Sequence, residues 1–357
     1  MKFNVFSGLP EYDRHEQVVE CIDEPSGLHT IIAVHNTSRG PALGGCRMWP
    51  YVDREEAAKD ALRLSRGMTY KSALADLNLG GGKAVIIGDP SKDKSEALLK
   101  MMGRFINTLQ GLYITAEDSG TSVEDMVTMS TETEWVAGIQ NDAIHGGDPS
   151  PSTAYGTFVG MRAAVRRKLG RSDFSGLRVA IQGVGNVGFH LAKLLSEQGA
   201  ELVVADINAA NIERLRTVSD ANVVSIDQIY DQDVDVFSPC AMGSAISELT
   251  VNRIKAKVIA GAANNQLATP VQGDQLHQKG VLYVPDYVLN AGGIVDIAYQ
   301  RAGGDEVQVR AHIDGIVNTL DEIFRRSEAE GHPTYKVADQ LAEERFFWNS
   351  TPASMVA

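Results

Sequence analysis

The sequence predicts an α/β protein with two domains, the second of them a doubly wound, Rossmann-type parallel sheet. Its 357 residues exceed what one hydrophobic core usually holds. In the second half, short apolar runs alternate with helical patterns, which is typical of a parallel sheet. A cluster of Gly, Pro and Ser near residues 146–152 indicates a linker. We expect one domain over residues 1–140, with C-terminal helices 330–357 packing back on it, and the other over residues 141–329.

The first domain reads as strands and helices in turn. Residues 28–36 (LHTIIAVHN) predict a strand, and a stretch rich in Gly and Pro follows it. Residues 53–76 keep a helical period of apolar positions, and residues 83–88 (KAVIIG) predict a buried strand. An amphipathic helix is expected next, ending near Gly111, and then a strand, LYITAED, that ends in acidic residues.

The second domain begins with an expected helix over residues 152–170. Residues 177–207 then predict a strand, a glycine turn, a helix and a second strand. Short apolar strands follow in VDVFSPC, AKVIAG and VLYVPDYV, and the last stretch, residues 310–346, is helical in pattern. This alternation is the main reason to expect a doubly wound fold.

Composition excludes several classes of function. The formal net charge is −13, whereas nucleic acids and anionic membranes require a basic surface. The three cysteines lie far apart, the eight histidines are scattered, and we expect reduced thiols and no protein-bound metal. No apolar run is long enough for a membrane span or resembles a signal peptide, so we expect a cytoplasmic protein.

The glycine turn of the second domain has the spacing of a dinucleotide-binding loop. Gly183, Gly185 and Gly188 form a G-x-G-x-x-G pattern between a strand and a helix, and Asp206 closes the next strand about 20 residues later. We expect the loop to hold the pyrophosphate and Asp206 to bind the ribose hydroxyls, which favours NAD over NADP. The alternative is a strand–turn–helix unit that binds no ligand. The predicted cofactor-binding loop is Gly183, Val184, Gly185, Asn186, Val187 and Gly188.

A second glycine run, LNLGGGKAVII, precedes Lys83. The spacing excludes a Walker phosphate loop, because Leu77 stands where the first glycine is needed and Ala84 where Ser or Thr is needed. Lys83 is then either an ordinary lysine with its ammonium group in water, or a desolvated lysine beside glycines that leave room for a substrate. Lys71 lies shortly upstream, and two ammonium groups in one cleft disfavour each other's charge, which suits one of them to act as a neutral base.

The ordered motifs resemble a known family. GPALGGCRMWP, GMTYKSALADLNLGGGKAVIIGDP, YITAEDSGT, GDPSPSTAYG, GVGNVG, IAGAANNQL and PDYVLNAGGI are similar to motifs of the glutamate/leucine/phenylalanine/valine dehydrogenases, and come nearest to its leucine-specific branch. The resemblance extends to about Arg345. It implies NAD-dependent oxidative deamination of an L-amino acid to a 2-oxo acid, ammonium and NADH, and the reverse reaction, in a homo-oligomer of unspecified size.

The resemblance also implies residue roles. Lys83 would activate the water that attacks the imino carbon, and Asp118 would move protons at the amino group. Lys71 would pair with the substrate carboxylate, Asn265 would reach the substrate region, and Thr153 and Asn264 would lie at the cofactor. For Asp118 and the two asparagines, a solvent-facing acid and turn-forming residues remain the alternatives. The implied substrate-binding set is Lys71, Leu43, Gly44, Gly45, Ala116, Asn265, Ile294 and Ile297.

The residue before the paired glycines bears on the substrate. Glutamate-specific members carry a lysine there, whereas this chain has Leu43, which cannot compensate a buried side-chain carboxylate. We therefore expect branched-chain aliphatic substrates such as leucine. An aromatic substrate remains an alternative, as does an NAD-sensing scaffold without catalysis. Cys46 and Asp296 depart from the Thr and Asn usual in this branch.

Overall fold

The protein is described by a computed structural model that covers residues 6–139, 148–241 and 243–347. It divides into two compact units. Unit 1 comprises residues 1–148, 297–305 and 342–357, and unit 2 comprises residues 149–296 and 306–341. The two α/β domains expected from the sequence are present. Their division falls eight residues later than expected. The expected C-terminal return to the first domain begins at residue 342, not at residue 330, and residues 297–305 also belong to unit 1.

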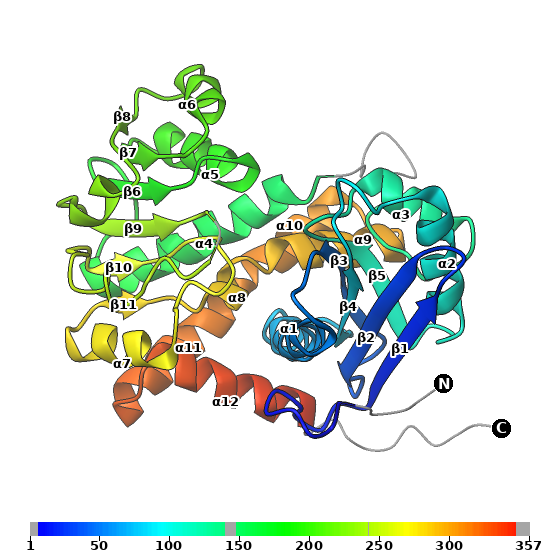
Figure 1. Cartoon of the computed structure of the whole chain (residues 1–357). Helices are drawn as coiled ribbons and strands as arrows, with labels where there is room; N and C mark the ends of the chain where they lie inside the picture. The colour runs from blue at the N-terminus through cyan, green and yellow to red at the C-terminus, as the bar shows by residue number, and fades with distance from the viewer. Residues whose placement is uncertain (1–5, 140–147, 242, 348–357) are drawn as a thin grey trace. The chain divides into compact units, whose positions relative to one another are not determined.

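Unit 1 is built on a mixed sheet (Figure 1). Within the described residues its strands are β1 (Gln17–Asp23), β2 (Leu28–Asn36), β3 (Ala42–Trp49), β4 (Gly80–Ile87) and β5 (Tyr113–Glu117), in the order β1-β2-β4-β3-β5. Strands β1, β2 and β4 pair antiparallel, whereas β3 pairs parallel with β4 and with β5. The sequence predicts β2 with its observed bounds, but it does not predict β1 or the glycine-rich β3.

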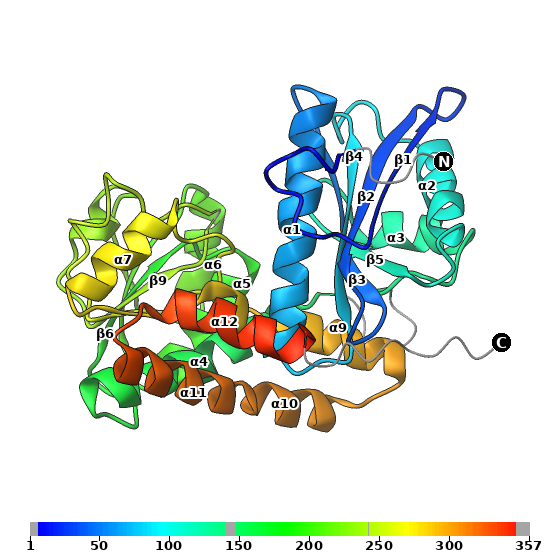
Figure 2. The same ribbon diagram turned by 90° about the horizontal axis from the view of Figure 1, so that it is seen from below.

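Helices cover both faces of this sheet (Figure 2). On one face lies α1 (Arg54–Leu74), and on the other lie α2 (Glu96–Asn107) and α3 (Val123–Ser130). Strand residues alternate between the two faces: Val85 packs with Ala57, Ala58, Ala61 and Leu62 of α1, while Ala84 packs in the cluster of α2 and α3. The small alanines of α1 allow the helix to lie close to the strands. Asp53 caps α1 by accepting a hydrogen bond from Glu56 N at 2.8 Å.

Unit 2 contains the doubly wound sheet. Its strands, among the residues that the structure describes, are all parallel in the order β11-β10-β9-β6-β7-β8. They are β6 (Arg178–Gln182), β7 (Glu201–Ala205), β8 (Asn222–Val223), β9 (Val236–Pro239), β10 (Val258–Ile259) and β11 (Leu282–Tyr283). The first expected helix is α4 (Ser150–Leu169), which ends at Gly170 in a left-handed conformation that suits glycine.

The remaining helices of the chain follow the strands of unit 2. They are α5 (Asn186–Glu197), α6 (Ala209–Arg216), the short 3-10 helix η1 (Gln228–Asp231), α7 (Pro270–Gln278), α8 (Asp286–Leu289), α9 (Gly292–Ala302), α10 (Glu306–Asp314), α11 (Ile316–Glu330) and α12 (Thr334–Phe347). Both α9 and α12 contribute residues to each unit. In the described residues, no helix is long and apolar enough to cross a membrane.

Two histidines are buried together between β2 and α1. The ring centroids of His15 and His35 are 4.8 Å apart. His35 Nδ1 lies 2.9 Å from Thr69 Oγ1, and His15 Nε2 lies 3.0 Å from Ser65 Oγ. Burial lowers the pKa of both imidazoles, that of His35 to about 3. Both side chains are therefore neutral in the folded protein at neutral pH.

This burial predicts acid sensitivity of the fold. Because the pKa of His35 is lowered on folding, the unfolded chain binds the proton first, and stability is lost as pH falls from about 6.5 towards 3. We expect wild type to lose about 1 kcal/mol more than His35→Gln between about pH 6.5 and about pH 5.5. Urea unfolding at the two pH values measures this difference. Equal losses in the two proteins would contradict it.

Candidate active site

Lys83 lies in the middle of β4, on the sheet face that α1 covers. Gly81 and Val85 flank it two residues away, and both face α1. The side chain is almost fully buried, with an exposed fraction of 6% for the residue. The alternative of a surface lysine with its ammonium group in water is therefore wrong.

The glycines before Lys83 serve the packing of the protein itself. A Cβ on Gly81 would lie 2.0 Å from Thr69 N in α1, and one on Gly82 would lie 2.6 Å from the Tyr113 ring. A Cβ on Gly80 would lie 2.1 Å from Asn36 O. Both faces of β4 are thus filled by protein atoms at these positions. The interpretation that these glycines leave room for a substrate is wrong: they let α1 and the Tyr113 ring lie against the strand.

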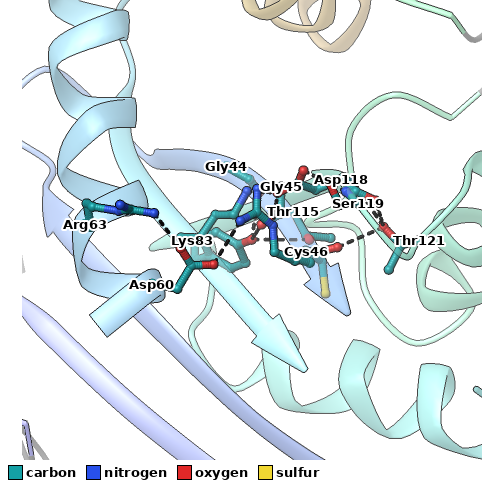
Figure 3. Close-up of polar contacts among 12 residues, drawn as sticks. Gly44, Gly45, Cys46, Asp60, Arg63, Lys83, Thr115, Asp118, Ser119 and Thr121 are labelled. Atoms are coloured by element: carbon teal, nitrogen blue, oxygen red, sulfur yellow. Dashed lines mark hydrogen bonds and ion pairs between the residues drawn. The ribbon is translucent and has the colours of Figure 1, made fainter. Parts of the chain in front are cut away.

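The ammonium group of Lys83 forms a direct ion pair with Asp118 Oδ2 (Figure 3). Asp118 follows the end of β5, and its side chain is 19% exposed. Burial raises the pKa of the Asp118 carboxyl, but the Lys83 and Arg47 cations outweigh burial and lower that pKa to about 2. Asp118 is therefore ionised and compensates the buried lysine. The solvent-facing alternative for Asp118 is wrong.

The turn after β5 holds Asp118 in place. Ser119 N donates to Asp118 Oδ1 at 2.7 Å, and Asp118 N donates to Thr121 Oγ1 at 3.0 Å. Thr121 Oγ1 in turn donates to Cys46 O at 2.8 Å, which ties the turn to β3. A Cβ on Gly45 would lie 2.7 Å from Asp118 Cβ, so the carboxylate depends on a glycine at that position.

Several of the predicted substrate-binding residues share this sheet face. Leu43 is opposite Gly81 in the parallel pairing, and Gly45 is opposite Ala116. Leu43 and Ala116 are buried, with exposed fractions of 2% and 5%. A Cβ on Gly44 would lie 1.7 Å from Gly82 O, so this glycine is needed for the contact between β3 and β4.

Lys71 lies in the last turn of α1, half-buried. It stands two residues beyond Thr69, whose backbone meets Gly81. Lys71 therefore lies at the end of α1 that contacts the start of β4, the strand that holds Lys83.

The structure adds two residues that sequence reasoning missed, Arg47 on β3 and Asp60 on α1. Arg47 Nη1 donates to Asp60 Oδ2 at 2.9 Å, and Arg47 Nε lies 3.4 Å from Asp118 Oδ2. The signal available in the sequence was the spacing of two between Gly45 and Arg47, which places both on one face of a strand. Asp60 carried no such signal, because its contact depends on how α1 packs.

The glycine loop of unit 2 has the geometry that its spacing predicts. Gly183 has a φ of +91°, which favours glycine, and a Cβ on Gly188 would lie 2.0 Å from Gly183 O. At Gly185 no described atom lies within 4 Å of the Cβ position, and this residue precedes the first turn of α5. The backbone beside a helix N-terminus is thus open to an anionic group. Val184 is buried, while Asn186 is exposed and Val187 half-buried.

Asp206 lies directly after β7 and contacts this loop. Its Oδ2 accepts hydrogen bonds from Val184 N at 2.8 Å and from Asn211 Nδ2 at 3.2 Å. Its Oδ1 accepts one from Asn208 N at 2.7 Å. The carboxylate therefore fixes the glycine loop to the end of β7.

The remaining predicted site residues lie in loops or within helices α4 and α9. Thr153 is in the first turn of α4, and its hydroxyl donates to Pro149 O at 3.0 Å. Asn264 and Asn265 are exposed, and Asn265 has a φ of +54°, a turn conformation that asparagine tolerates. Ile294 is buried in unit 2, whereas Ile297 is half-buried and belongs to unit 1.

The departure at position 296 has a local partner. Ser152 Oγ donates to Asp296 Oδ2 at 2.5 Å, and both residues lie in unit 2. A carboxylate at this position is therefore bound to the start of α4.

Comparison with known proteins identifies the family. Residues 15–135 match the family described as Glu/Leu/Phe/Val dehydrogenase, dimerisation domain. Residues 148–212 and 204–340 match the family described as Glutamate/Leucine/Phenylalanine/Valine dehydrogenase. The chain belongs to this dehydrogenase family. It is an amino acid dehydrogenase, which makes the alternative of a scaffold without catalysis wrong.

Individual relatives of this dehydrogenase cover nearly its whole length. Leucine dehydrogenase of Bacillus subtilis (strain 168) is 50% identical over 341 residues, which are 96% of this chain and 93% of that protein. Phenylalanine dehydrogenase of Bacillus thermotolerans is 42% identical, with 96% and 90% covered. The crystal structure of L-tryptophan dehydrogenase from Nostoc punctiforme is similar with a TM-score of 0.82 at 41% identity, covering 94% of this chain and 97% of that one.

The packing of α1 on β4 gives a stability prediction. Gly81→Ala would place a methyl group against the α1 backbone, so we expect a loss of at least about 2 kcal/mol of unfolding free energy. Gly67→Ala is the matched control: it lies inside α1 with open space around it and should gain up to about 1 kcal/mol. Chemical denaturation of both variants tests this. Wild-type stability in Gly81→Ala would refute the close contact.

Proposed function

We propose that this dehydrogenase catalyses the NAD-dependent oxidative deamination of L-leucine and other branched-chain aliphatic L-amino acids, and the reverse reductive amination. The observation that carries the proposal is the buried Lys83–Asp118 ion pair on a sheet face where Leu43 and Ala116 supply apolar surface. Leucine dehydrogenases at 48–50% identity, against 42–43% for the phenylalanine dehydrogenases, support leucine as the substrate.

Three charged residues of unit 1 have proposed roles in the reaction. The Lys71 ammonium would bind the substrate carboxylate, helped by backbone N–H groups near Gly44 and Gly45. Once hydride has left Cα, Lys83 would release its ammonium proton to solvent, and the neutral amine would take a proton from the water that attacks the iminium carbon. Asp118 would hold the Lys83 ammonium before the reaction and would move the proton at the departing nitrogen. A buried pair of this kind has low solvent access, which strengthens each of these interactions.

The coenzyme would bind to unit 2, where NAD would accept the hydride. The open backbone at Gly185 and the start of α5 fit a pyrophosphate. Asp206 would accept hydrogen bonds from the ribose hydroxyls and would repel a 2′-phosphate, which favours NAD over NADP. Thr153 and Asn264 would lie nearer the nicotinamide, and Asn265 nearer the substrate.

Leu43, Ala116 and Ile297, all in unit 1, would supply the apolar pocket for the substrate side chain. Apolar burial contributes about 0.8 kcal/mol per methylene, so such a pocket favours aliphatic side chains and rejects a carboxylate.

We further propose that the enzyme works in the cytoplasm as a homo-oligomer. The family description of residues 15–135 as a dimerisation domain supports the oligomer.

Steady-state kinetics with four amino acids tests the proposed substrate class. We expect kcat/KM for leucine and valine to exceed that for phenylalanine and tryptophan by at least about tenfold, because an aromatic ring needs more room than a branched aliphatic side chain. NADH formation at 340 nm is the readout. A preference for either aromatic substrate would assign the enzyme to the aromatic branch of the family.

Coenzyme titration separates binding from catalysis. Lys83→Ala should lose at least about a hundredfold in kcat, since it removes the proposed base, yet bind NADH with wild-type affinity. Both proteins should bind NADPH more weakly than NADH because of Asp206. Fluorescence titration with each coenzyme gives the affinities. Full turnover in Lys83→Ala would refute the mechanism, and tighter binding of NADPH would refute the coenzyme assignment.

A further inference from the structure

Arg47 brings a second cation to Asp118. It lies on β3, two residues after Gly45, and its side chain shares the α1 face of the sheet. Its Nε lies 3.4 Å from Asp118 Oδ2, the oxygen atom that also contacts the Lys83 ammonium. One carboxylate oxygen therefore faces two cations from neighbouring strands.

The Arg47 guanidinium is only partly satisfied in this arrangement. Nε is buried and makes no hydrogen bond to any residue that the structure describes, although it stands within ion-pair distance of Asp118. A buried N–H without a hydrogen bond costs about 1–3 kcal/mol. A carboxylate oxygen can accept two hydrogen bonds, so this N–H would gain a full hydrogen bond to Asp118 Oδ2 if the carboxylate moved slightly towards Arg47.

The other side of the guanidinium is anchored. Asp60 Oδ2 accepts from Arg47 Nη1 at 2.9 Å and from the Tyr51 hydroxyl at 2.7 Å. Asp60 Oδ1 accepts from Arg63 at 3.2 Å (Figure 3). The Asp60 side chain is 13% exposed. This anchor on α1 fixes the planar guanidinium, so Nε keeps its direction towards Asp118.

We propose that Arg47 is a positioning residue for the reaction: it is the cation that remains paired with Asp118 when Lys83 leaves the carboxylate to act on the substrate. This inference rests on the roles of Lys83 and Asp118 in the proposed function. Arg47 keeps the carboxylate ionised and in place during the step in which the lysine is neutral. Without Arg47, a buried carboxylate would lose its last cation and would bind a proton more readily.

The charges around Asp118 decide the sign of the pH effect. The ionisable groups that interact electrostatically with it are Lys83 from β4, Arg47 and Cys46 from β3, Tyr113 and Glu117 from β5, and Tyr51 from the segment after β3. Lys83 and Arg47 are the cations in this set. Lys83 and Asp118 titrate as a coupled pair, and removing the Arg47 cation makes this pair hold its proton more tightly, which moves the acid limb of the kcat profile to higher pH.

A purely structural role for Arg47 gives a different result. If Arg47 served only to tie β3 to α1 through Asp60, its loss would lower stability and the amount of active enzyme. It would leave the pH profile of the remaining activity unchanged. The pH profile therefore distinguishes the two roles.

The test measures kcat and KM for leucine from about pH 6 to about pH 10, together with NADH affinity, in the full-length enzyme. The variants are Arg47→Met, Arg47→Lys and Asp60→Asn. Arg104→Met is the matched control, because Arg104 also pairs with a carboxylate, Glu132, in unit 1 at the surface.

We expect Arg47→Met to lose at least about tenfold in kcat, with KM and NADH affinity within about twofold of wild type. Its acid limb should move up by about one pH unit. Arg47→Lys should recover part of both effects, Asp60→Asn should show a smaller shift in the same direction, and Arg104→Met should match wild type.

Wild-type acid limbs in both Arg47 variants would overturn the inference. If Arg47→Met does not fold, Arg47→Lys and Asp60→Asn decide in the same way. A wild-type enzyme that does not oxidise leucine would overturn the proposed function instead. The two failures are therefore distinct.

Discussion

Burial of the Lys83 ammonium is the constraint on which the arrangement of unit 1 depends. An isolated ammonium group in a protein interior is costly by several kcal/mol, so it requires a charged partner with fixed geometry. Asp118 provides that partner, and the turn after β5 holds it through Ser119 and Thr121. Gly45 leaves the space that the carboxylate occupies. The stable burial of the lysine that we propose as the base thus comes from these few contacts.

The contact between α1 and β4 positions the charged residues that α1 contributes to unit 1. Because Gly81 has no side chain, the helix backbone at Thr69 lies directly against the strand. The same helix also contains Asp60, which binds Arg47, and Lys71, which lies in its last turn. Thr69 also binds the buried His35, so a helix that organises the site contributes to the acid sensitivity of the fold.

The sequence predicts more of unit 2 than of unit 1, for a physical reason. The dinucleotide loop depends on local spacing, and Gly183, Gly188 and Asp206 have the geometry that this spacing implies. The glycine-rich β3 was not predicted, because its glycines are required by contacts with β4 and Asp118 that are remote in sequence. For the same reason the glycines before Lys83 were misread, and the contact between Arg47 and Asp60 depends on helix packing that no local pattern encodes.

Asp206, which we propose to recognise the coenzyme, is also part of the scaffold. Its carboxylate would exclude a 2′-phosphate by charge, yet it also accepts the hydrogen bond from Val184 N within the glycine loop. Replacing it with a neutral residue would remove the repulsion and leave that buried N–H without its acceptor, at a cost of about 1–3 kcal/mol. The glycine loop and the carboxylate that we propose to select the ribose are therefore energetically coupled. Changing coenzyme preference in this protein requires a new acceptor for Val184 N as well as a new charge.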